Sequence, residues 1–302
     1  MKKTFRILGL ALVVTGLLFS GCKKTEDEEE EEDLALEVEV SQTASKMTLL
    51  YEQFTGNRVT KGALGHKYAN EVCEALGDKA IVINYHIYGN NYADAYTTDF
   101  CSTINSQFNV DNGRYNLPTV MFNRRDFRGL EGKIALDLDE DQNTYMNAAE
   151  FIVEEDAVAN VAASAVIDRE TRELTVHAKV YYTANGKGST NRLNVLLIQN
   201  NVMGEQTGAE DNPAQVVGTQ YRHMSMFRDY LYKKDYWGEP ISPVKAGTTI
   251  DKTYTYNIPA SYTDTRNNNS EPAVLEDLEV VVYVSEYRGN VINACKAKIT
   301  IL

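Results

Sequence analysis

The sequence predicts an α/β domain followed by an all-β, immunoglobulin-like sandwich domain. Three observations support this: strand-like and helix-like segments alternate over residues 47–156, period-two alternation dominates after residue 157, and a short apolar stretch near the start ends at a cysteine. With 302 residues, the chain has room for two ordinary domains. We divide it into a signal peptide (1–21), an acidic tether (22–44), an α/β domain (45–156) and a β-sandwich domain (157–302).

The first segment has the features of a lipoprotein signal. Positive charges at Lys2, Lys3 and Arg6 precede an apolar stretch over residues 7–19. About 13 apolar residues are too few to cross about 30 Å of hydrocarbon, so this is a signal rather than a membrane span. Two small residues then precede Cys22. We expect Cys22 to become the lipid-bearing N-terminus that anchors the protein to a membrane.

An acidic run from Glu26 to Asp33 follows the anchor. Such a segment cannot bury apolar surface, so we expect a solvated tether. It also resembles the export signal that directs Bacteroidetes-type lipoproteins to the outer face of the outer membrane. The predicted location is therefore the outer membrane, with the protein lipid-anchored and exposed on the cell surface; a plain spacer is the alternative.

Composition excludes several classes of partner and site. The formal net charge is −13, which argues against nucleic acid and anionic lipid as electrostatic partners. After Cys22 only Cys73, Cys101 and Cys295 remain, without a Cys-x-x-Cys pair or zinc-type spacing. We expect these three to be free thiols in the core and expect no cofactor or metal.

The α/β domain follows from its apolar spacing. The pattern predicts strand 47–54, helix 63–76, strand 80–88, helix 94–108, strand 119–123, a short strand near 127–136 and helix 143–155. This order implies a partly parallel sheet covered on both faces. Cys73 and Cys101 would then lie on opposite faces, too far apart for a disulfide.

The second domain is predicted from alternation. Leu174, Val176 and Val180 alternate with polar residues and indicate a half-buried strand. Asn185-Gly186 marks a turn. Further strands are expected at 193–199, 253–258, 278–284 and 291–301, with a short helix or ordered loop at 221–232. Such a series of strands suggests an antiparallel sandwich.

Several short segments carry a family resemblance over about residues 45–302. They are Phe54-Thr55-Gly56, Gly65-His66, Leu117-Pro118-Thr119 with Asn123-Arg124, Tyr221-Arg222-His223-Met224 followed by Arg228, and Val291-Ile292-Asn293-Ala294. In this order they resemble the Bacteroidetes 28-kilodalton outer-membrane protein family. The resemblance implies a thioredoxin-like fold for the first domain and a β-rich second domain.

The sequence departs from the family at its redox motif. After the Phe-Thr-Gly turn, the family resemblance implies a Cys-x-x-Cys-Pro segment, which many members carry. In this sequence Val59 and Gly62 occupy the two cysteine positions, and Ala63 occupies the proline position. No thiolate can form at the helix start, so we expect no oxidoreductase activity. Pro118 matches the cis-proline loop of thioredoxin-like folds, where backbone groups can pair with a peptide. Alternatively, Pro118 simply opens a strand.

Two further patterns in the sequence bear on metal binding and catalysis. Asp139, Asp141, Asn143, Asn147 and Glu150 have the spacing of an EF-hand calcium loop, but Thr144 replaces the glycine at the sixth position. An acidic linker before a helix capped by Asn143 or Thr144 fits better. The four histidines are scattered in the sequence, which favours structural roles.

The sequence therefore predicts a non-enzymatic binding or adhesion protein on the cell surface, with a protein or peptide partner. We expect the partner to contact the loop that carries Arg58 and Lys61, beside Pro118. Two alternatives stay open: a peptide-capture protein derived from a thiol–disulfide oxidoreductase, and a glycan-binding accessory lipoprotein.

Overall fold

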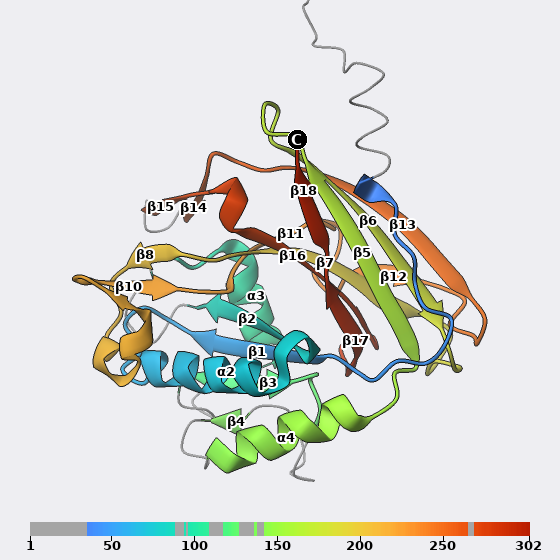
Figure 1. Cartoon of the computed structure of the whole chain (residues 1–302), viewed down its shortest axis with the longest axis horizontal. Helices are drawn as coiled ribbons and strands as arrows, with labels where there is room; N and C mark the ends of the chain where they lie inside the picture. Colours follow the sequence, from blue (N-terminus) through green and yellow to red (C-terminus); the bar gives the residue numbers. More distant parts are fainter. Residues whose placement is uncertain are drawn as a thin grey trace, which may run out of the picture.

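The computed structural model describes residues 35–87, 94, 96–108, 117–126, 136–137, 142–264 and 269–302 (Figure 1). Cys22 and the acidic run lie outside this part of the chain. So do residues 127–135 of the predicted short strand, and Asp139 and Asp141 of the calcium-like motif.

The first half has the predicted order of elements. They are β1 (Leu49–Thr55), α2 (Gly62–Leu76), β2 (Ala80–His86), α3 (Asp99–Phe108), β3 (Thr119–Phe122), β4 (Leu136–Asp137) and α4 (Gln142–Glu154). β1 pairs in parallel with β2 and antiparallel with β3, and β3 pairs antiparallel with β4. The partly parallel sheet is confirmed.

Helices cover both faces of this sheet, as predicted. Leu49 and Tyr51 of β1 pack in a cluster with α2 and α4, whereas Leu50 and Phe54 pack in a cluster with α3. The alternation follows from the period-two geometry of a strand. Cys73 on α2 and Cys101 on α3 accordingly lie on opposite faces, and both are free.

The second half is almost entirely β-structure. Its strands are β5 (Ala159–Ile167), β6 (Glu173–Tyr182), β7 (Asn191–Gln199), β8 (Val202–Gly204), β9 (Val216–Val217), β10 (Gln220–His223), β11 (Met226–Tyr230), β12 (Glu239–Ile241), β13 (Thr249–Asn257), β14 (Ser261–Asp264), β15 (Asn269–Pro272), β16 (Leu278–Ser285), β17 (Val291–Lys296) and β18 (Lys298–Ile301). Short 3-10 turns η2 (Ala209–Asp211) and η3 (Pro213–Gln215) connect β8 to β9.

Strands from both halves join one sheet. Its order is β17-β16-β7-β11-β2-β1-β3-β4, with β12 added at β7. The two halves of the chain join where β11 pairs with β2. Met226 lies opposite Asn84, and the backbone N–H of Asn84 donates to the Ser225 carbonyl over 2.8 Å. The predicted domain boundary near residue 156 therefore falls between α4 and β5 along the chain, but strands from both sides of it belong to the same sheet.

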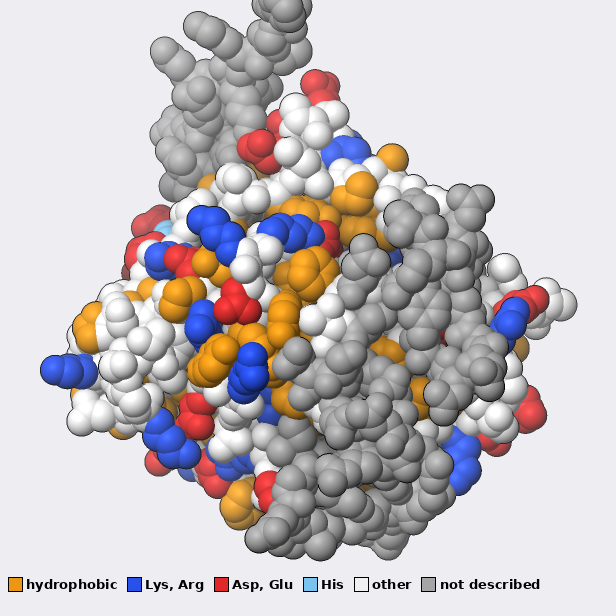
Figure 2. Space-filling model, turned by 180° about the vertical axis from the view of Figure 1, so that it is seen from behind, with side chains coloured by type: hydrophobic (Ala, Val, Ile, Leu, Met, Phe, Trp, Pro, Cys, Tyr) orange, Lys and Arg blue, Asp and Glu red, His pale blue; other side chains and the backbone are white. Residues whose placement is uncertain are grey.

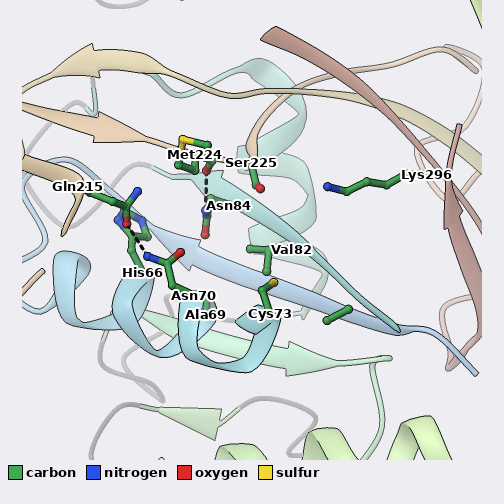
Figure 3. A pocket seen from close by; sticks show the side chains of 11 residues that line it. His66, Ala69, Asn70, Cys73, Val82, Asn84, Gln215, Met224, Ser225 and Lys296 are labelled. Atoms are coloured by element: carbon green, nitrogen blue, oxygen red, sulfur yellow. Dashed lines mark hydrogen bonds between the residues drawn. The ribbon is translucent and has the colours of Figure 1, made fainter. Parts of the chain in front are cut away.

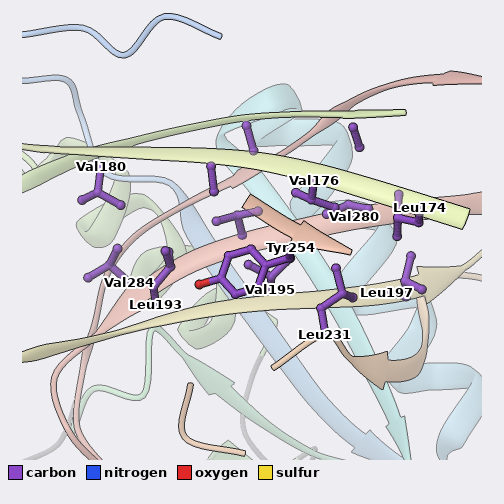
Figure 4. Close-up of a cluster of buried hydrophobic side chains, with 14 of the residues drawn as sticks. Leu174, Val176, Val180, Leu193, Val195, Leu197, Leu231, Tyr254, Val280 and Val284 are labelled. Atoms are coloured by element: carbon purple, nitrogen blue, oxygen red, sulfur yellow. The ribbon is translucent and has the colours of Figure 1, made fainter. Parts of the chain in front are cut away.

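A second sheet, of order β13-β6-β5-β18, packs over β7 and β16. Figure 4 shows the apolar side chains between the two sheets, which include Val176, Val180, Leu193, Val195 and Val284. Along β7, Leu193, Val195 and Leu197 face this core, whereas Leu196 and Ile198 face the core beneath α3. The central strands are thus covered on both faces.

Four sequence expectations differ from the structure. Helix α3 begins at Asp99 rather than at residue 94, because the Asp94 side chain is committed to contacts in the preceding loop. The expectation of a short helix or ordered loop at 221–232 is wrong: this segment forms β10 and β11, which are fixed by pairing with β8 and β7. The predicted strand 291–301 is two strands, which break at Ala297 and enter different sheets.

The fourth difference concerns the tether. Its last part packs on the outer side of β5 and β6 instead of being solvated throughout. The Ser164 hydroxyl donates to the Leu36 carbonyl over 2.6 Å, and Asn160 Nδ2 donates to the carbonyls of Ser41 and Thr43, both over 2.7 Å.

The described helices are all too short or too polar to span a bilayer. Figure 2 shows the face behind that of Figure 1, where acidic and basic side chains are interspersed around central apolar side chains. The described residues of this face do not form a continuous basic patch, in keeping with the negative net charge.

Candidate functional site

The loop between β1 and α2 carries two of the predicted contact residues. Arg58 and Lys61 are exposed on it, whereas Pro118, just before β3, is buried. The Leu117–Pro118 peptide bond is cis, as the resemblance implied. A Cβ atom at Gly65 would lie 2.8 Å from Pro118 Cγ, so the first turns of α2 rest against the proline. The two loops therefore lie side by side, as expected.

The chain itself covers this loop. Residues 205–208, here called the strap, run across it between β8 and η2. The Thr207 amide donates to the Asn57 carbonyl over 2.8 Å, and Gln206 Nε2 donates to the carbonyls of Gly56 and Val59 over 3.3 and 3.2 Å. We expected the backbone groups of this loop to be free for a peptide; that expectation is wrong because the strap already uses three carbonyls.

Glycines at the strap allow this close approach. Gly208 has φ +73°, and a Cβ atom there would overlap the Thr60 carbonyl oxygen. Immediately before the strap, a Cβ atom at Gly204 would overlap the Tyr96 hydroxyl. A larger side chain at either position would force the strap or its neighbours to move.

Three histidines meet beneath the strap. His66 lies on α2, His86 ends β2 and His223 ends β10; they are 3%, 1% and 1% exposed. The ring of His223 lies 5.3 Å from that of His86 and 6.1 Å from that of His66, between centroids. These three histidines, scattered in the sequence, therefore come together in the fold. The fourth, His177, lies on the outer side of β6 against Asp251, as its strand position predicted.

Asp94 organises the edge of this cluster. Its carboxylate accepts hydrogen bonds from the backbone amides of Asn57 and Tyr96 and contacts His86 Nδ1 at 3.1 Å. Burial opposes ionisation of Asp94, but His86 and the hydrogen bonds outweigh burial and lower the pKa of this carboxyl. A buried carboxylate thus fixes the orientation of one histidine.

The other two histidines are held in their neutral form. Burial lowers the pKa of His66 well below its ordinary value and lowers the pKa of His223 to about 3, and neighbouring histidines add to both shifts. His66 Nε2, His86 Nε2 and His223 Nδ1 are buried without a hydrogen-bond partner. Across the described ranges, however, no three histidine, cysteine or acidic side chains are arranged to hold a metal ion.

A polar cavity of about 70 Å³, here called the inner cavity, adjoins His66 (Figure 3). In Figure 3, Asn84 and Ser225 come from the sheet side, Asn70 and Cys73 from α2, and Lys296 reaches in from β17. The full lining is His66, Ala69, Asn70, Cys73, Ala80, Val82, Asn84, Gln215, Met224, Ser225 and Lys296.

A larger pocket of about 580 Å³, here called the outer pocket, lies next to the inner cavity. Both are lined by Cys73, Ala80 and Lys296, so they meet at these residues. The outer pocket is bounded by α2, the start of β2, and β17, and thus lies where the two halves of the chain meet. Its other polar lining residues are Ser45, Thr48, Asp78 and Asn293.

A buried ion pair ties the same two halves together. Arg124 donates two hydrogen bonds of 2.7 Å to the Glu52 carboxylate, and both side chains are almost fully buried. Arg124 also donates to the Tyr283 hydroxyl of β16 over 2.8 Å, and the Tyr85 hydroxyl of β2 donates to Glu52. This network is structural: it lies inside the shared sheet, beneath α3.

The described cysteines are unsuited to thiolate chemistry. Burial raises the pKa of Cys101 to about 11 and that of Cys295 to about 12, and it also raises the pKa of Cys73. Cys101 is buried as predicted, whereas Cys73 and Cys295 are only partly buried.

Sequence reasoning missed most of this site. It noted His66 and His223 as parts of family-like segments but did not bring them together with His86, Asp94 and Asn84, which lie on other elements. The available signal was the position of His86 at the end of a parallel strand, an edge where ligands bind in open α/β sheets.

Comparisons with known proteins complete the description. Residues 105–301 match the model of a family described as "Outer membrane protein Omp28". The structure is similar to that of HBP35 of Porphyromonas gingivalis, with a TM-score of 0.63 and 16% identity, over 85% of this chain and 78% of that one. This similarity shows a shared fold.

Two other solved structures match less well. A domain of the outer membrane lipoprotein Omp28 from Porphyromonas gingivalis has a TM-score of 0.30 and 19% identity, over 48% of this chain and 90% of that one. Protein AGR_C_4864 from Agrobacterium tumefaciens has a TM-score of 0.45 and 13% identity, over 85% and 96%. No curated protein sequence shows significant similarity.

Proposed function

The chain belongs to the Omp28 family of outer membrane proteins, and on this premise we propose that it is a lipid-anchored, redox-inactive binding protein displayed on the cell surface. The family and the outer-membrane location are those predicted from the sequence. Anchoring through Cys22 and display through the acidic run remain inferences from the sequence.

A thioredoxin-like first half is supported by its order of elements and by the fold shared with HBP35. The four-stranded sheet packed on β7 and β16 supports a sandwich of the immunoglobulin-like kind in the second half. Both assignments give a scaffold for binding and leave activity to its loops.

The observation that carries the proposal is the closed loop after β1. The positions where a thioredoxin-like enzyme needs thiols hold Val59 and Gly62, and the strap covers the adjoining backbone. A peptide that pairs with this backbone would have to displace Gln206 and Thr207, which disfavours the peptide-capture alternative. Arg58 and Lys61 stay exposed at the edge, where they can contact an acidic partner.

Two measurements test this proposal on the full chain in its own cells. A protease added to intact cells should remove the protein, and a palmitate analogue should label it only when Cys22 is present. Full protection until lysis, or equal labelling of Cys22→Ala, would contradict display or anchoring. Insulin reduction by the purified protein would contradict the redox-inactive assignment.

A further inference from the structure

We propose that the inner cavity and the outer pocket together form a binding site for a neutral polyhydroxyl ligand such as a sugar. This inference goes beyond the function proposed above, since it concerns a different surface and does not depend on where the protein is displayed. It rests on unpartnered buried acceptors, on the absence of carboxylates from the described lining of the inner cavity and on the available space.

The inner cavity contains two residues with buried, unpartnered hydrogen-bonding atoms, Asn84 Oδ1 and His66 Nε2. Asn84 Nδ2 donates to the Met224 carbonyl over 2.8 Å, which fixes the amide and leaves its oxygen as the free atom. Such unpaired acceptors cost about 1–3 kcal/mol each unless a donor reaches them.

The proton arrangement around His66 makes its free nitrogen an acceptor as well. The Tyr221 hydroxyl accepts from Asn212 Nδ2 over 3.1 Å and donates its single proton to Gln215 Oε1, also over 3.1 Å. With the Tyr221 proton on Gln215 Oε1, His66 Nδ1, 2.9 Å from the same hydroxyl, is the donor in their contact. His66 Nε2 then carries a lone pair, so a ligand with two hydrogen-bond donors would match both atoms.

The charge of the lining selects among donor groups. Burial keeps His66 neutral and raises the pKa of the Cys73 thiol, so neither supplies a charge at neutral pH. Lys296, at the junction with the outer pocket, is paired with Glu279 at 2.7 Å. In the inner cavity an ammonium group would find no carboxylate among the described lining residues and would lie beside a lysine, and an anion would face two acceptors; both are disfavoured there. Asp78 lines only the outer pocket.

Hydroxyl groups fit what remains. Hydroxyl groups can donate to Asn84 Oδ1 and His66 Nε2 and can also exchange a hydrogen bond with Ser225, which lines the cavity as well. An apolar group would leave both acceptors unpaired. Ordered water can satisfy the same atoms, and water alone is the outcome that the test must exclude.

The dimensions suit one end of a sugar in the inner cavity and the rest in the outer pocket. The inner cavity, at about 70 Å³, has room for roughly five groups the size of a water molecule. The outer pocket, at about 580 Å³, lies in the range of small-molecule sites, roughly 300–1,000 Å³, and lies between two structural units, where such sites are common. Its hydroxyl and amide lining offers further partners.

Cys73 provides a reporter for the test, because it lines both spaces and is only partly buried. The full chain, purified in detergent, is treated with a small thiol reagent in the presence of glucose, galactose, mannose or N-acetylglucosamine. At a sugar concentration ten times Kd, labelling of Cys73 should slow about tenfold, since roughly one molecule in eleven remains free.

Two lining variants and one control make the result specific. Ala69→Leu fills the inner cavity, and the milder Ala80→Val narrows the junction; both should abolish protection by sugar. Ala75→Leu adds the same side chain as the first variant at an exposed position of α2 and should keep protection. Melting curves identify any variant that fails to fold, and the other then decides.

Three results would overturn the proposal. Failure of all four sugars to slow labelling would mean that the cavities hold water only. Equal protection in both folded lining variants would mean that the sugar binds elsewhere. Stronger protection by glutamine, whose side-chain amide also offers two donors, would assign the site to an amide ligand instead.

Discussion

Acidification should destabilise this protein through its buried histidines. His66 and His223 are neutral and enclosed by α2, β10 and the strap, and burial lowers the pKa of both. On unfolding, each ring reaches water and regains an ordinary pKa of about 6.5. Below that pH the unfolded chain binds protons that the folded chain excludes, so folding stability falls as the pH falls.

The magnitude follows from the two pKa values. For His223, with a folded pKa of about 3, lowering the pH from 7 to 5 protonates the unfolded ring and leaves the folded one neutral. This costs about 2 kcal/mol of unfolding free energy. The lowered pKa of His66 adds to this loss in the same direction. Asp94 changes little in this interval, because an ordinary aspartate titrates near pH 4.

The assay is urea unfolding at pH 7 and pH 5, followed by the fluorescence of Trp237, the chain's single tryptophan, which is buried. Each variant is compared with itself at the two pH values, so that the cost of the substitution cancels. His223→Gln and His66→Gln should each reduce the pH-dependent loss, and the double variant should remove most of it. His86 and Asp94 are not substituted in any of these variants.

Two results would refute the reasoning. A wild-type loss below about 1 kcal/mol between pH 7 and pH 5 would mean that both histidines can be protonated in the folded state. The full wild-type loss in His223→Gln would mean that other groups govern the acid response.

Three further predictions concern the ion pair, the strap and the thiols. Arg124→Met should cost about 3–5 kcal/mol of stability because it leaves Glu52 buried without its partner, and adding Glu52→Leu should recover most of the loss; additive costs in urea unfolding would contradict this. Gly208→Ala should destabilise the protein by more than Gly218→Ala. Gly218 is the control because it has a similar φ of +62° and open space around it, and its substitution should cost about 1–2 kcal/mol. Equal melting temperatures of the two variants would contradict the close approach of the strap to Thr60. In native protein a thiol reagent should modify Cys73 well before Cys101 and Cys295, and all three should react at once after denaturation; fast modification of Cys101 would contradict its burial.

The elements that sequence predicted well are those with strong local periodicity. β6 alternates buried and half-buried residues along its whole length, and α2 carries its buried residues at helical spacing, so each was found within two residues of its observed ends. The family resemblance was predictable for a different reason: short segments such as Tyr221-Arg222-His223-Met224 are specific in their order even where no single one is decisive.

The elements that sequence reasoning missed are fixed by distant partners. The segment from residue 221 has apolar residues at helical spacing, but its backbone pairs with β8 and β7, and β11 also meets β2. Likewise, the histidine cluster draws its members from α2, β2 and β10, which are far apart along the chain. Local patterns carry no information on which strands become neighbours, so neither the shared sheet nor the site could be derived from them.

The shared sheet also changes how the binding regions should be viewed. Were the two halves separate units, the loop after β1 would belong to the first and any sandwich surface to the second. Instead, the strap from the second half closes that loop, His223 from the second half completes the histidine cluster, and Lys296 of β17 borders the inner cavity. Each candidate site is thus built from both halves. Since the Glu52–Arg124 pair and its contact to Tyr283 also cross the junction, cutting the chain near residue 156 would remove every one of these sites together with part of the core.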